Sequence, residues 1–227
     1  MSRARHEYKY LINTVQEELL RQRAACLLAR DPYAGADGSY FIRSLYFDDP
    51  DDGCLLDNES GTDRRSKFRI RYYNHDSSVL RLEKKSKIRG MTRKVSCPLS
   101  QEEGRMLTEG RIPAVTPGLP PQKQQLFLEL QLRGLTPKVI VSYERIPFVY
   151  AAGNVRITFD RKLSSSGDVS RFLSGDYGFR PVAGPGTSVL EVKWDQLLPP
   201  HIQDSLQLDS LQWTSFSKYY MCRIYHL

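Results

Sequence analysis

Six segments of the chain alternate charged and apolar residues with a period of two, and most of their charges are basic. The clearest segment, residues 67–72, has the sequence Lys-Phe-Arg-Ile-Arg-Tyr. The others lie at residues 7–10, 81–85, 143–145, 155–160 and 189–194. Because successive side chains of a strand point to opposite faces, each segment predicts a strand with one ionic and one apolar face. Six such strands predict a sheet whose charged face surrounds a shared, anionic ligand.

Further elements follow from apolar spacing and from turn and capping residues. Additional strands are predicted at residues 40–47, 91–97 and 137–149. Helices are predicted at residues 15–29, 122–133, 201–208 and 215–225, with a short one after Ser100. Asn13 or Thr14 is the expected cap of the first helix, and Ser100 with Glu103 forms a capping-box pattern. A Pro- and Gly-rich loop is expected at residues 111–121, and an irregular segment at residues 164–186.

The strands are spread over the whole length, so we expect one domain comprising residues 1–227. Many antiparallel strands with two unlike faces usually form a sandwich or a barrel. The helices have no other apolar surface on which to pack, so the apolar strand faces should lie beneath them. The charged faces then point inward, and because buried like charges are costly unless paired or solvated, the interior should be water-filled. The predicted fold class is α+β, an antiparallel β-barrel tunnel with a charged interior and helices packed outside.

Composition narrows the partners and the compartment. The chain has 227 residues and a formal net charge of +7, which favours phosphate-bearing partners. It contains no apolar run long enough to span a bilayer and no signal-peptide core at its N-terminus. The four cysteines are widely spaced, which is typical of reduced packing residues, and the histidines are scattered, which disfavours a zinc site. We therefore expect a cytoplasmic protein.

Alternation also predicts which ionic side chains face the interior. The basic ones are Lys9, Arg69, Arg71, Arg81, Lys85, Lys94, Arg145, Arg156 and Lys193. The acidic ones are Glu7, Glu83, Asp160 and Glu191. Arginines can bind phosphate oxygens in a bidentate manner, whereas lysines act as point charges. Each carboxylate could form a cross-strand salt bridge or hold Mg²⁺ or Mn²⁺, and Glu191 and Glu7 are the candidate metal ligands.

The ordered set of these segments resembles the successive motifs of a known family, the VTC polyphosphate polymerase domain of the triphosphate tunnel metalloenzymes. The matching segments are residues 7–10, 67–73, 82–85, 93–95, 142–145, 155–160, 190–193 and 215–219. No single motif is specific, but together they cover nearly the whole chain in order.

The resemblance implies a tunnel that binds a nucleoside triphosphate at one mouth. It also implies transfer of the γ-phosphate of ATP to a growing polyphosphate chain with a divalent metal, Mn²⁺ or Mg²⁺. The residues that match the family's phosphate-binding and catalytic bases are Arg69, Arg71, Lys85, Lys94, Arg145, Arg156 and Lys218. Lys9 matches a further phosphate-binding base, Lys193 joins this set from its place on the charged face, and Glu191 matches the metal-binding carboxylate.

Two departures from related sequences bear on the activity. Ser215 stands where the family commonly has a lysine. No regulatory or membrane-spanning domain is attached, so transport across a membrane is expected to need a membrane-protein partner.

The hydrolase branch of the superfamily typically opens with Glu-x-Glu-x-Lys, and here Arg5 stands at the first glutamate position. Water needs a base or a second metal to become a nucleophile, whereas a terminal phosphate oxygen is already ionised. Fewer carboxylates therefore favour transfer to phosphate.

Three functions remain open from the sequence, and a polyphosphate polymerase is preferred. The second is a triphosphatase in the same tunnel, and the third is a non-catalytic module that binds polyphosphate or nucleic acid. Nucleic-acid binding by strands usually uses exposed aromatic residues, and the chain has 13 tyrosines. Tyr8, Tyr10 and Tyr72 alternate opposite to the basic residues, however, which predicts packing roles and disfavours nucleic acid. The preferred nucleotide, the metal and the oligomeric state are not determined by these patterns.

Overall fold

A computed structural model of the chain describes residues 5–89, 91–175 and 178–226. Its strands are β1 (His6–Ile12), β2 (Ala29–Arg30), β3 (Tyr40–Asp48), β4 (Arg65–Tyr73), β5 (Asp76–Ile88), β6 (Met91–Leu99), β7 (Thr136–Tyr150), β8 (Val155–Ser166), β9 (Arg180–Pro181) and β10 (Ser188–Trp194). Its α-helices are α1 (Thr14–Leu27), α2 (Gly53–Glu59), α3 (Gln101–Thr108), α4 (Pro121–Leu132), α5 (Pro200–Leu206) and α6 (Lys218–Ile224). In this part of the chain, no helix combines the length and apolar character that a membrane span requires.

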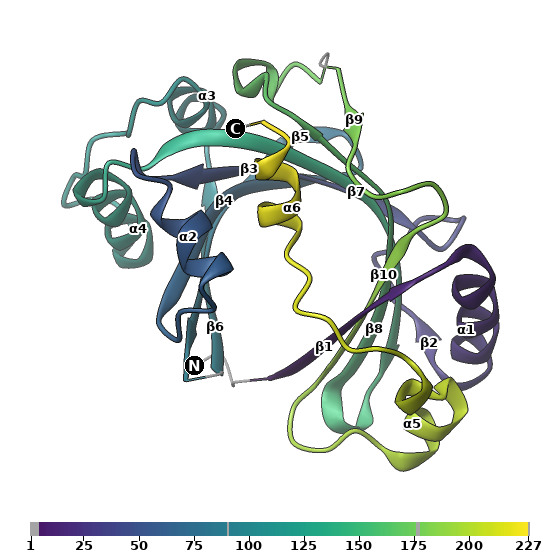
Figure 1. The fold of residues 1–227 in the computed structure, drawn as a ribbon. Helices are drawn as coiled ribbons and strands as arrows, with labels where there is room; N and C mark the ends of the chain where they lie inside the picture. The colour runs from purple at the N-terminus through teal and green to yellow at the C-terminus, as the bar shows by residue number, and fades with distance from the viewer. Residues whose placement is uncertain (1–4, 90, 176–177, 227) are drawn as a thin grey trace.

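The strands form one curled antiparallel sheet in the order β1-β10-β8-β7-β3-β4-β5-β6, with β2 paired to β7 and β9 to β8. Figure 1 shows this sheet bending into a deep arc, with β1 and β6 at its two ends. The free edge of β1 is partly covered by the segment before α6, because the backbone N–H of Thr214 donates to the carbonyl of Lys9 at 2.9 Å. The predicted fold class is confirmed, and the barrel has the form of an open half-barrel.

The predicted alternation is clearest in the hairpin of β4 and β5. Phe68, Ile70 and Tyr72 are buried on the convex side of the sheet, and the basic residues between them face the concave side. The two strands meet at Asn74 and His75, which have positive φ values of 51° and 60°. Two consecutive left-handed residues match the right-handed twist of a two-residue hairpin turn, and Asn tolerates that conformation.

Two apolar cores lie between the convex side of the sheet and the outer helices. One core packs β1, β8 and β10 against α1 and α5, and includes Phe159, Leu190 and Leu20. The other packs β4, β5 and β6 against α3 and α4, and includes Phe68, Leu82 and Leu126. In Figure 1, these four helices lie outside the arc. The prediction that the apolar strand faces lie beneath the helices is confirmed for them.

A third apolar core corrects the expectation of a concave side that is charged throughout. It contains Ile42 and Tyr46 of β3, Val141 and Tyr143 of β7, and residues of α2 and α6. Figure 1 shows α6 lying within the arc rather than outside it. The apolar run Val139-Ile140-Val141 is fully buried, as expected of a strand that is covered on both faces. The charged part of the concave side is therefore confined to the regions flanking this core.

Of the predictions from local sequence patterns, some are confirmed and others are wrong. Both capping predictions are confirmed, because Asn13 accepts from the backbone N–H of Gln16 at 2.9 Å and Ser100 accepts from that of Glu103 at 3.1 Å. Helix α2 was not predicted. The start of the supposedly irregular segment 164–186 is regular, since β8 continues to Ser166 and pairs with β9. Residues 176–177 of that segment lie outside the described residues.

Candidate functional site

Ten cationic side chains from seven strands and one helix gather on the concave side of the sheet. They are Lys9, Lys67, Arg69, Arg71, Lys85, Lys94, Arg145, Arg156, Lys193 and Lys218. The strands place them there because residues two apart share a face, and Lys218 is brought in at the start of α6. Every base predicted from the resemblance is in this group. Their roles in binding or catalysis remain predictions.

A row of three carboxylates lies among these cations. Asp160 of β8 is fully buried and accepts two hydrogen bonds from Arg145, at 2.6 and 2.7 Å. Lys218 also pairs with Asp160, at 2.6 Å. Arg145 extends the row to Glu191 of β10 at 3.3 Å, and Lys193 joins Glu191 at 2.9 Å. Buried charges are tolerated here because each has an opposite charge within hydrogen-bonding distance.

The row ends at Glu7, at a seam where β1, one end of the sheet, approaches β5, the strand beside the end strand β6. Lys85 of β5 contacts Glu7 of β1 at 2.9 Å, and Lys9 contacts the same carboxylate at 3.1 Å. Burial and the nearby Glu191 raise the pKa of the Glu7 carboxyl, but the surrounding lysines outweigh them and lower it to about 2. Glu7 is therefore ionised at neutral pH. An ion pair, rather than a backbone ladder, bridges the seam between β1 and β5.

A second group centres on Glu83 of β5. Its carboxylate is buried and pairs with Arg69 at 2.7 Å, Lys94 at 2.6 Å and Arg71 at 4.0 Å. Burial raises the pKa of Glu83, but these three cations outweigh it and hold the pKa well below its usual range. Arg69 and Arg71 are oriented further by hydroxyl groups, the first by Tyr46 at 2.9 Å and the second by Ser44 at 2.9 Å.

Two predicted interior residues lie at the margins. Arg156 pairs with Asp31 at 2.8 Å and with the hydroxyl of Tyr40 at 2.7 Å, and thus belongs to neither carboxylate group. Arg81 lies on the predicted side of β5, but its side chain is exposed and, within the described part of the chain, forms a long hydrogen bond to Ser96, at 3.5 Å. The prediction that Arg81 faces the interior is wrong, because alternation sets the face of a residue but not how far that face is enclosed.

Neutral aromatic residues that the sequence reading did not assign form one wall of the site. Tyr46 stacks on Tyr219 with ring centroids 5.1 Å apart, and the Lys218 ammonium lies 5.0 Å from the Tyr143 ring centroid. Burial raises the pKa of the Tyr46 hydroxyl, but Arg69 and Arg71 outweigh it and lower the pKa. The signal was present in β3, where Tyr40, Ser44 and Tyr46 recur at even spacing and place hydroxyl groups on the concave side.

The charges of the site do not balance. Among the described residues, nine of the ten cations pair with five carboxylates, those of Glu7, Asp31, Glu83, Asp160 and Glu191, and Lys67 pairs with none. Burial and the neighbouring lysines lower the pKa of Lys85 to about 8, although Glu7 opposes them. A surplus of enclosed positive charge is costly in the absence of an anion. The arrangement is suited to binding a ligand with several negative charges.

One cluster of three metal-donor residues occurs in the described part of the chain, formed by Asp48, Asp49 and Cys54. It is a capping turn of α2, since the Asp48 carboxylate accepts from the backbone N–H of Cys54 at 2.8 Å and of Leu55 at 3.0 Å. The same carboxylate accepts from the Tyr219 hydroxyl. Burial and Asp48 raise the pKa of the Cys54 thiol to about 12, so it is neutral. These contacts give Asp48 a structural role at the start of α2.

Glu191 and Glu7 fit a divalent cation better. Both carboxylates contact Lys193, Glu191 at 2.9 Å and Glu7 at 3.8 Å. Hard oxygen donors suit Mg²⁺ and Mn²⁺, and Mg²⁺ is commonly held by one or two carboxylates together with substrate phosphates and water. Two carboxylates on this cationic face therefore match the donor set that such a cation takes from a protein.

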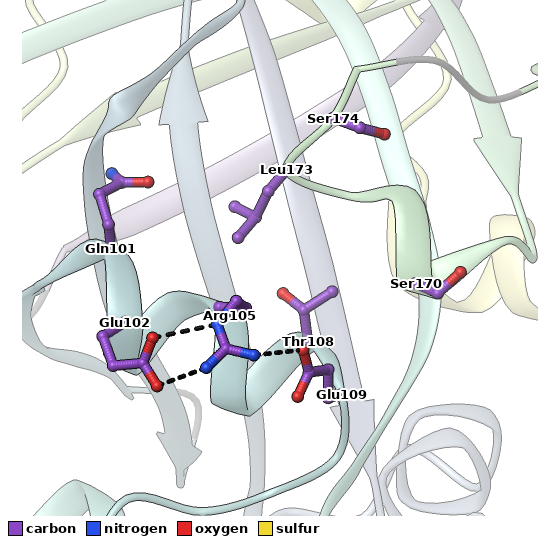
Figure 2. A pocket seen from close by; sticks show the side chains of 8 residues that line it. All are labelled: Gln101, Glu102, Arg105, Thr108, Glu109, Ser170, Leu173 and Ser174. Carbon is purple, nitrogen blue, oxygen red and sulfur yellow. Dashed lines mark hydrogen bonds and ion pairs between the residues drawn. The ribbon is translucent and has the colours of Figure 1, made fainter.

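A cavity also lies elsewhere on the molecule. It has a volume of about 380 Å³ and is open on the outer surface between α3 and residues 170–174 (Figure 2). Its charged residues pair with one another, as Arg105 contacts Glu102 at 2.6 Å and Glu109 at 2.9 Å. Its lining holds two glutamates and one arginine, so it has no surplus of positive charge, and it includes none of the ten cations. The concave side remains the candidate site.

Comparison with known proteins gave one family and a common fold. The model of the VTC domain family matches residues 4–225. No curated protein matches the sequence. A provisionally assigned adenylate cyclase from Bacillus halodurans is similar in structure, with a TM-score of 0.51, 16% identity and coverage of 92% of this chain and 89% of that chain. The PH1012 protein from Pyrococcus horikoshii OT3 has a TM-score of 0.51 and 13% identity, over 96% of this chain and 97% of that one.

A chain of the Schizosaccharomyces pombe Mediator head module is also similar, with a TM-score of 0.50, 7% identity and coverage of 92% of this chain and 97% of that chain. At these identities the likeness concerns the fold alone, a curled antiparallel sheet with helices outside it. One neighbour carries the name of a cyclase and another belongs to Mediator. Fold alone therefore leaves the chemistry to the side chains of the site.

Proposed function

This chain belongs to the VTC domain family, and from that premise we propose that it is a metal-dependent polyphosphate polymerase. The reaction is transfer of the γ-phosphate of ATP to the end of a growing polyphosphate chain. One observation carries the proposal: ten cations gather on one concave face, where nine of them pair with five carboxylates among the described residues. A linear anion with one or more charges per phosphate is the ligand that such a face binds best.

The side chains have distinct parts in this reaction. The guanidinium groups of Arg69, Arg71 and Arg145 bind phosphate oxygens and align donor and acceptor, while Lys9, Lys85 and Lys193 hold the chain near the seam. Arg156, Lys94 and Lys218 complete the proposed phosphate-binding set. Bound Mg²⁺ or Mn²⁺ supplies charge neutralisation and alignment, and Glu191 with Glu7 would hold it. A terminal oxygen of the chain bonds to the γ-phosphorus, the bond to the β,γ-bridging oxygen breaks, and ADP leaves.

The same carboxylates argue for transfer to phosphate over transfer to water. A general base needs a pKa near the working pH, whereas the pKa of Glu7 is about 2 and that of Glu83 is also strongly lowered. Each carboxylate of the described concave side is engaged by a cation. A phosphate oxygen that is already ionised needs alignment rather than deprotonation. This favours the polymerase over a triphosphatase.

The activity can be measured directly. Purified protein incubated with ATP and Mn²⁺ should produce ADP and a ladder of polyphosphates on a gel, and omission of the metal should abolish the ladder. Addition of tripolyphosphate as a primer should shorten any lag. Release of orthophosphate without a ladder would reject the polymerase and indicate a triphosphatase. Binding of tripolyphosphate without any turnover would leave a non-catalytic polyphosphate-binding module.

Nucleic acid is the weaker ligand on structural grounds. Tyr72 and Tyr10 have exposed fractions of 1% and 5%, so their rings are not available for base stacking. Tyr8 is more exposed, but its ring contacts those of Trp194 and Trp213. In a competition assay, tripolyphosphate should displace single-stranded DNA from the protein. Tight DNA binding that is indifferent to tripolyphosphate would contradict the proposed ligand.

The Arg69→Ala variant should lose roughly ten- to a hundredfold in affinity for tripolyphosphate, as expected for one charge-assisted contact. The fold should survive because Glu83 keeps Lys94 at 2.6 Å and Arg71 at 4.0 Å. Calorimetric titration measures the affinity, and circular dichroism during heating measures stability. Arg81→Ala is the matched control, since Arg81 lies on the neighbouring strand with an exposed side chain. Unfolding of Arg69→Ala with unchanged affinity in the folded fraction would contradict the assignment of faces.

A further inference from the structure

Lys67 differs from the other cations of the site in its partners. Its ammonium donates to the side-chain oxygen of Asn58 at 2.6 Å and to the hydroxyl of Ser217 at 2.8 Å. Both acceptors are neutral. Among the described residues, Lys67 is the one member of the ten-cation group that forms no ion pair with a carboxylate. When it is protonated, a half-buried ammonium with neutral acceptors has no opposite charge to neutralise it and can attract an anionic ligand.

Other cations surround Lys67 instead of anions. Lys85 is its direct cross-strand partner on β5, and like charges in that position repel. Lys9 approaches from β1, where its ammonium donates to the carbonyl of Phe216 at 3.0 Å, next to Ser217. Lys9, Lys67 and Lys85, here called the lysine triad, thus converge at the seam of the sheet. The triad shares a single carboxylate, Glu7, which pairs with Lys9 and Lys85.

The proton on Lys67 is loosely held as a consequence. Burial lowers the pKa of its ammonium, and Lys9, Lys85 and Arg65 lower it further, to about 7. The remaining titratable neighbour is the Cys54 thiol of α2, whose pKa of about 12 keeps it neutral, and the Tyr219 ring lies 5.7 Å away. A phosphate oxygen beside Lys67 would favour the charged form and raise its pKa again.

We propose that Lys67 is an additional phosphate-binding residue, and that anion binding at the lysine triad draws a proton from solution onto its neutral amine, which becomes an ammonium group. The ligand class is an oligophosphate chain. Three protonated lysines and one carboxylate leave an excess of positive charge, which a ligand with several linked negative charges would neutralise. This inference rests on the proposed function, since it concerns the same concave site. The inference adds a phosphate-binding residue whose protonation is coupled to phosphate binding.

The sign of the pH dependence follows from the two states of Lys67. Below about pH 7 the ammonium is already charged in the free protein, so binding needs no proton. Above that pH the free protein carries a neutral amine, and binding must take up a proton. Affinity for tripolyphosphate should therefore be highest on the acid side of pH 7 and decline as the pH rises.

Calorimetric titration with tripolyphosphate in metal-free buffer tests the proposal. Titrations at slightly alkaline pH in Hepes and in Tris, whose ionisation enthalpies differ, give the number of protons taken up. The wild-type protein should take up a substantial fraction of a proton. Lys67→Met should abolish the part of the proton uptake that is due to Lys67. It should also weaken tripolyphosphate binding roughly tenfold, as expected for the loss of one charge-assisted contact. Lys67→Arg, which is always charged, should retain the affinity but lose that proton uptake.

Two further variants separate ligand binding from a structural role. Lys84→Met is the matched control, because Lys84 lies on the opposite face of β5 and pairs with Glu129 of α4. It should leave both affinity and proton uptake unchanged. Asn58→Ala removes a neutral acceptor but not the charge, so proton uptake should persist. If Lys67→Met keeps wild-type affinity and uptake, Lys67 merely ties α2 to the C-terminal segment and the inference is overturned. A wild-type protein that fails to bind tripolyphosphate would overturn the proposed function as well.

Discussion

Replacing Glu191 by Gln is expected to lower metal-dependent turnover by on the order of a hundredfold or more while leaving metal-free tripolyphosphate binding intact. Glu191 is buried and pairs with Lys193 at 2.9 Å and Arg145 at 3.3 Å. The amide keeps the shape of the side chain but removes the charge that a divalent cation requires. Loss of one negative charge from this cationic face does not weaken its attraction for phosphate, so turnover and binding should separate.

A second buried glutamate provides the control for this prediction. Glu144 is also buried and ion-paired, with Arg161 at 2.7 Å and Lys162 at 2.9 Å, but it belongs to the opposite side of β7 from Arg145. The turnover of Glu144→Gln, calculated per folded molecule, should stay within a few-fold of the wild-type value. The measurement is polyphosphate formation as a function of Mn²⁺ concentration for both variants. Equal losses in the two would indicate a general effect of removing a buried charge and would contradict the metal role of Glu191.

The Phe68→Ala variant is expected to lose about 3–5 kcal/mol of unfolding free energy, the usual cost of removing a fully buried aromatic ring. Phe68 has an exposed fraction of 0% and lies in the core beneath α3 and α4. The cations of Lys84 and Arg133 lie 5.6 and 5.8 Å from its ring centroid and would lose that contact as well. Urea denaturation followed by circular dichroism gives the change.

Tripolyphosphate affinity should be unchanged in the folded fraction of Phe68→Ala, because the ring points away from the concave site. The adjacent variant Arg69→Ala should show the reverse, with affinity lost and stability largely kept. Two neighbouring residues of β4 thus report on the two faces of one strand. A Phe68→Ala protein with normal stability but weakened binding would show that the faces had been exchanged.

The parts of the site that were predictable depend on local regularity. Lys9, Lys85 and Arg145 could be placed on the charged face because alternation along a strand is a property of a few consecutive residues. Lys218 lies outside the alternating segments at the start of α6, and only the ordered resemblance to the VTC domain indicated it. Lys67 has the same spacing as Arg69 and could have been included, but nothing in its neighbourhood along the chain reveals that it lacks a carboxylate.

Other features could not have been predicted from local patterns. Helix α2 follows an acidic turn that has the composition of a loop, and its first turn is held by Asp48, a residue of the preceding strand. The third core exists because α6 returns into the arc and packs Tyr219 against Tyr46 of β3. Arg81 is the opposite case. The local pattern places it on the correct face of β5, but the sheet does not enclose its side chain.

By itself, the sequence determined the longer strands and which face their side chains take, because both depend on near neighbours in the chain, but it did not reveal the two-residue strands β2 and β9. It also determined the family, through motifs in a fixed order. Only the tertiary structure decided which charges meet. The contact of Lys85 with Glu7 joins residues 78 apart, and that of Lys67 with Ser217 joins residues 150 apart. Such pairs arise from the curvature of the sheet and the return of the C-terminal segment, and no short stretch of sequence encodes either one.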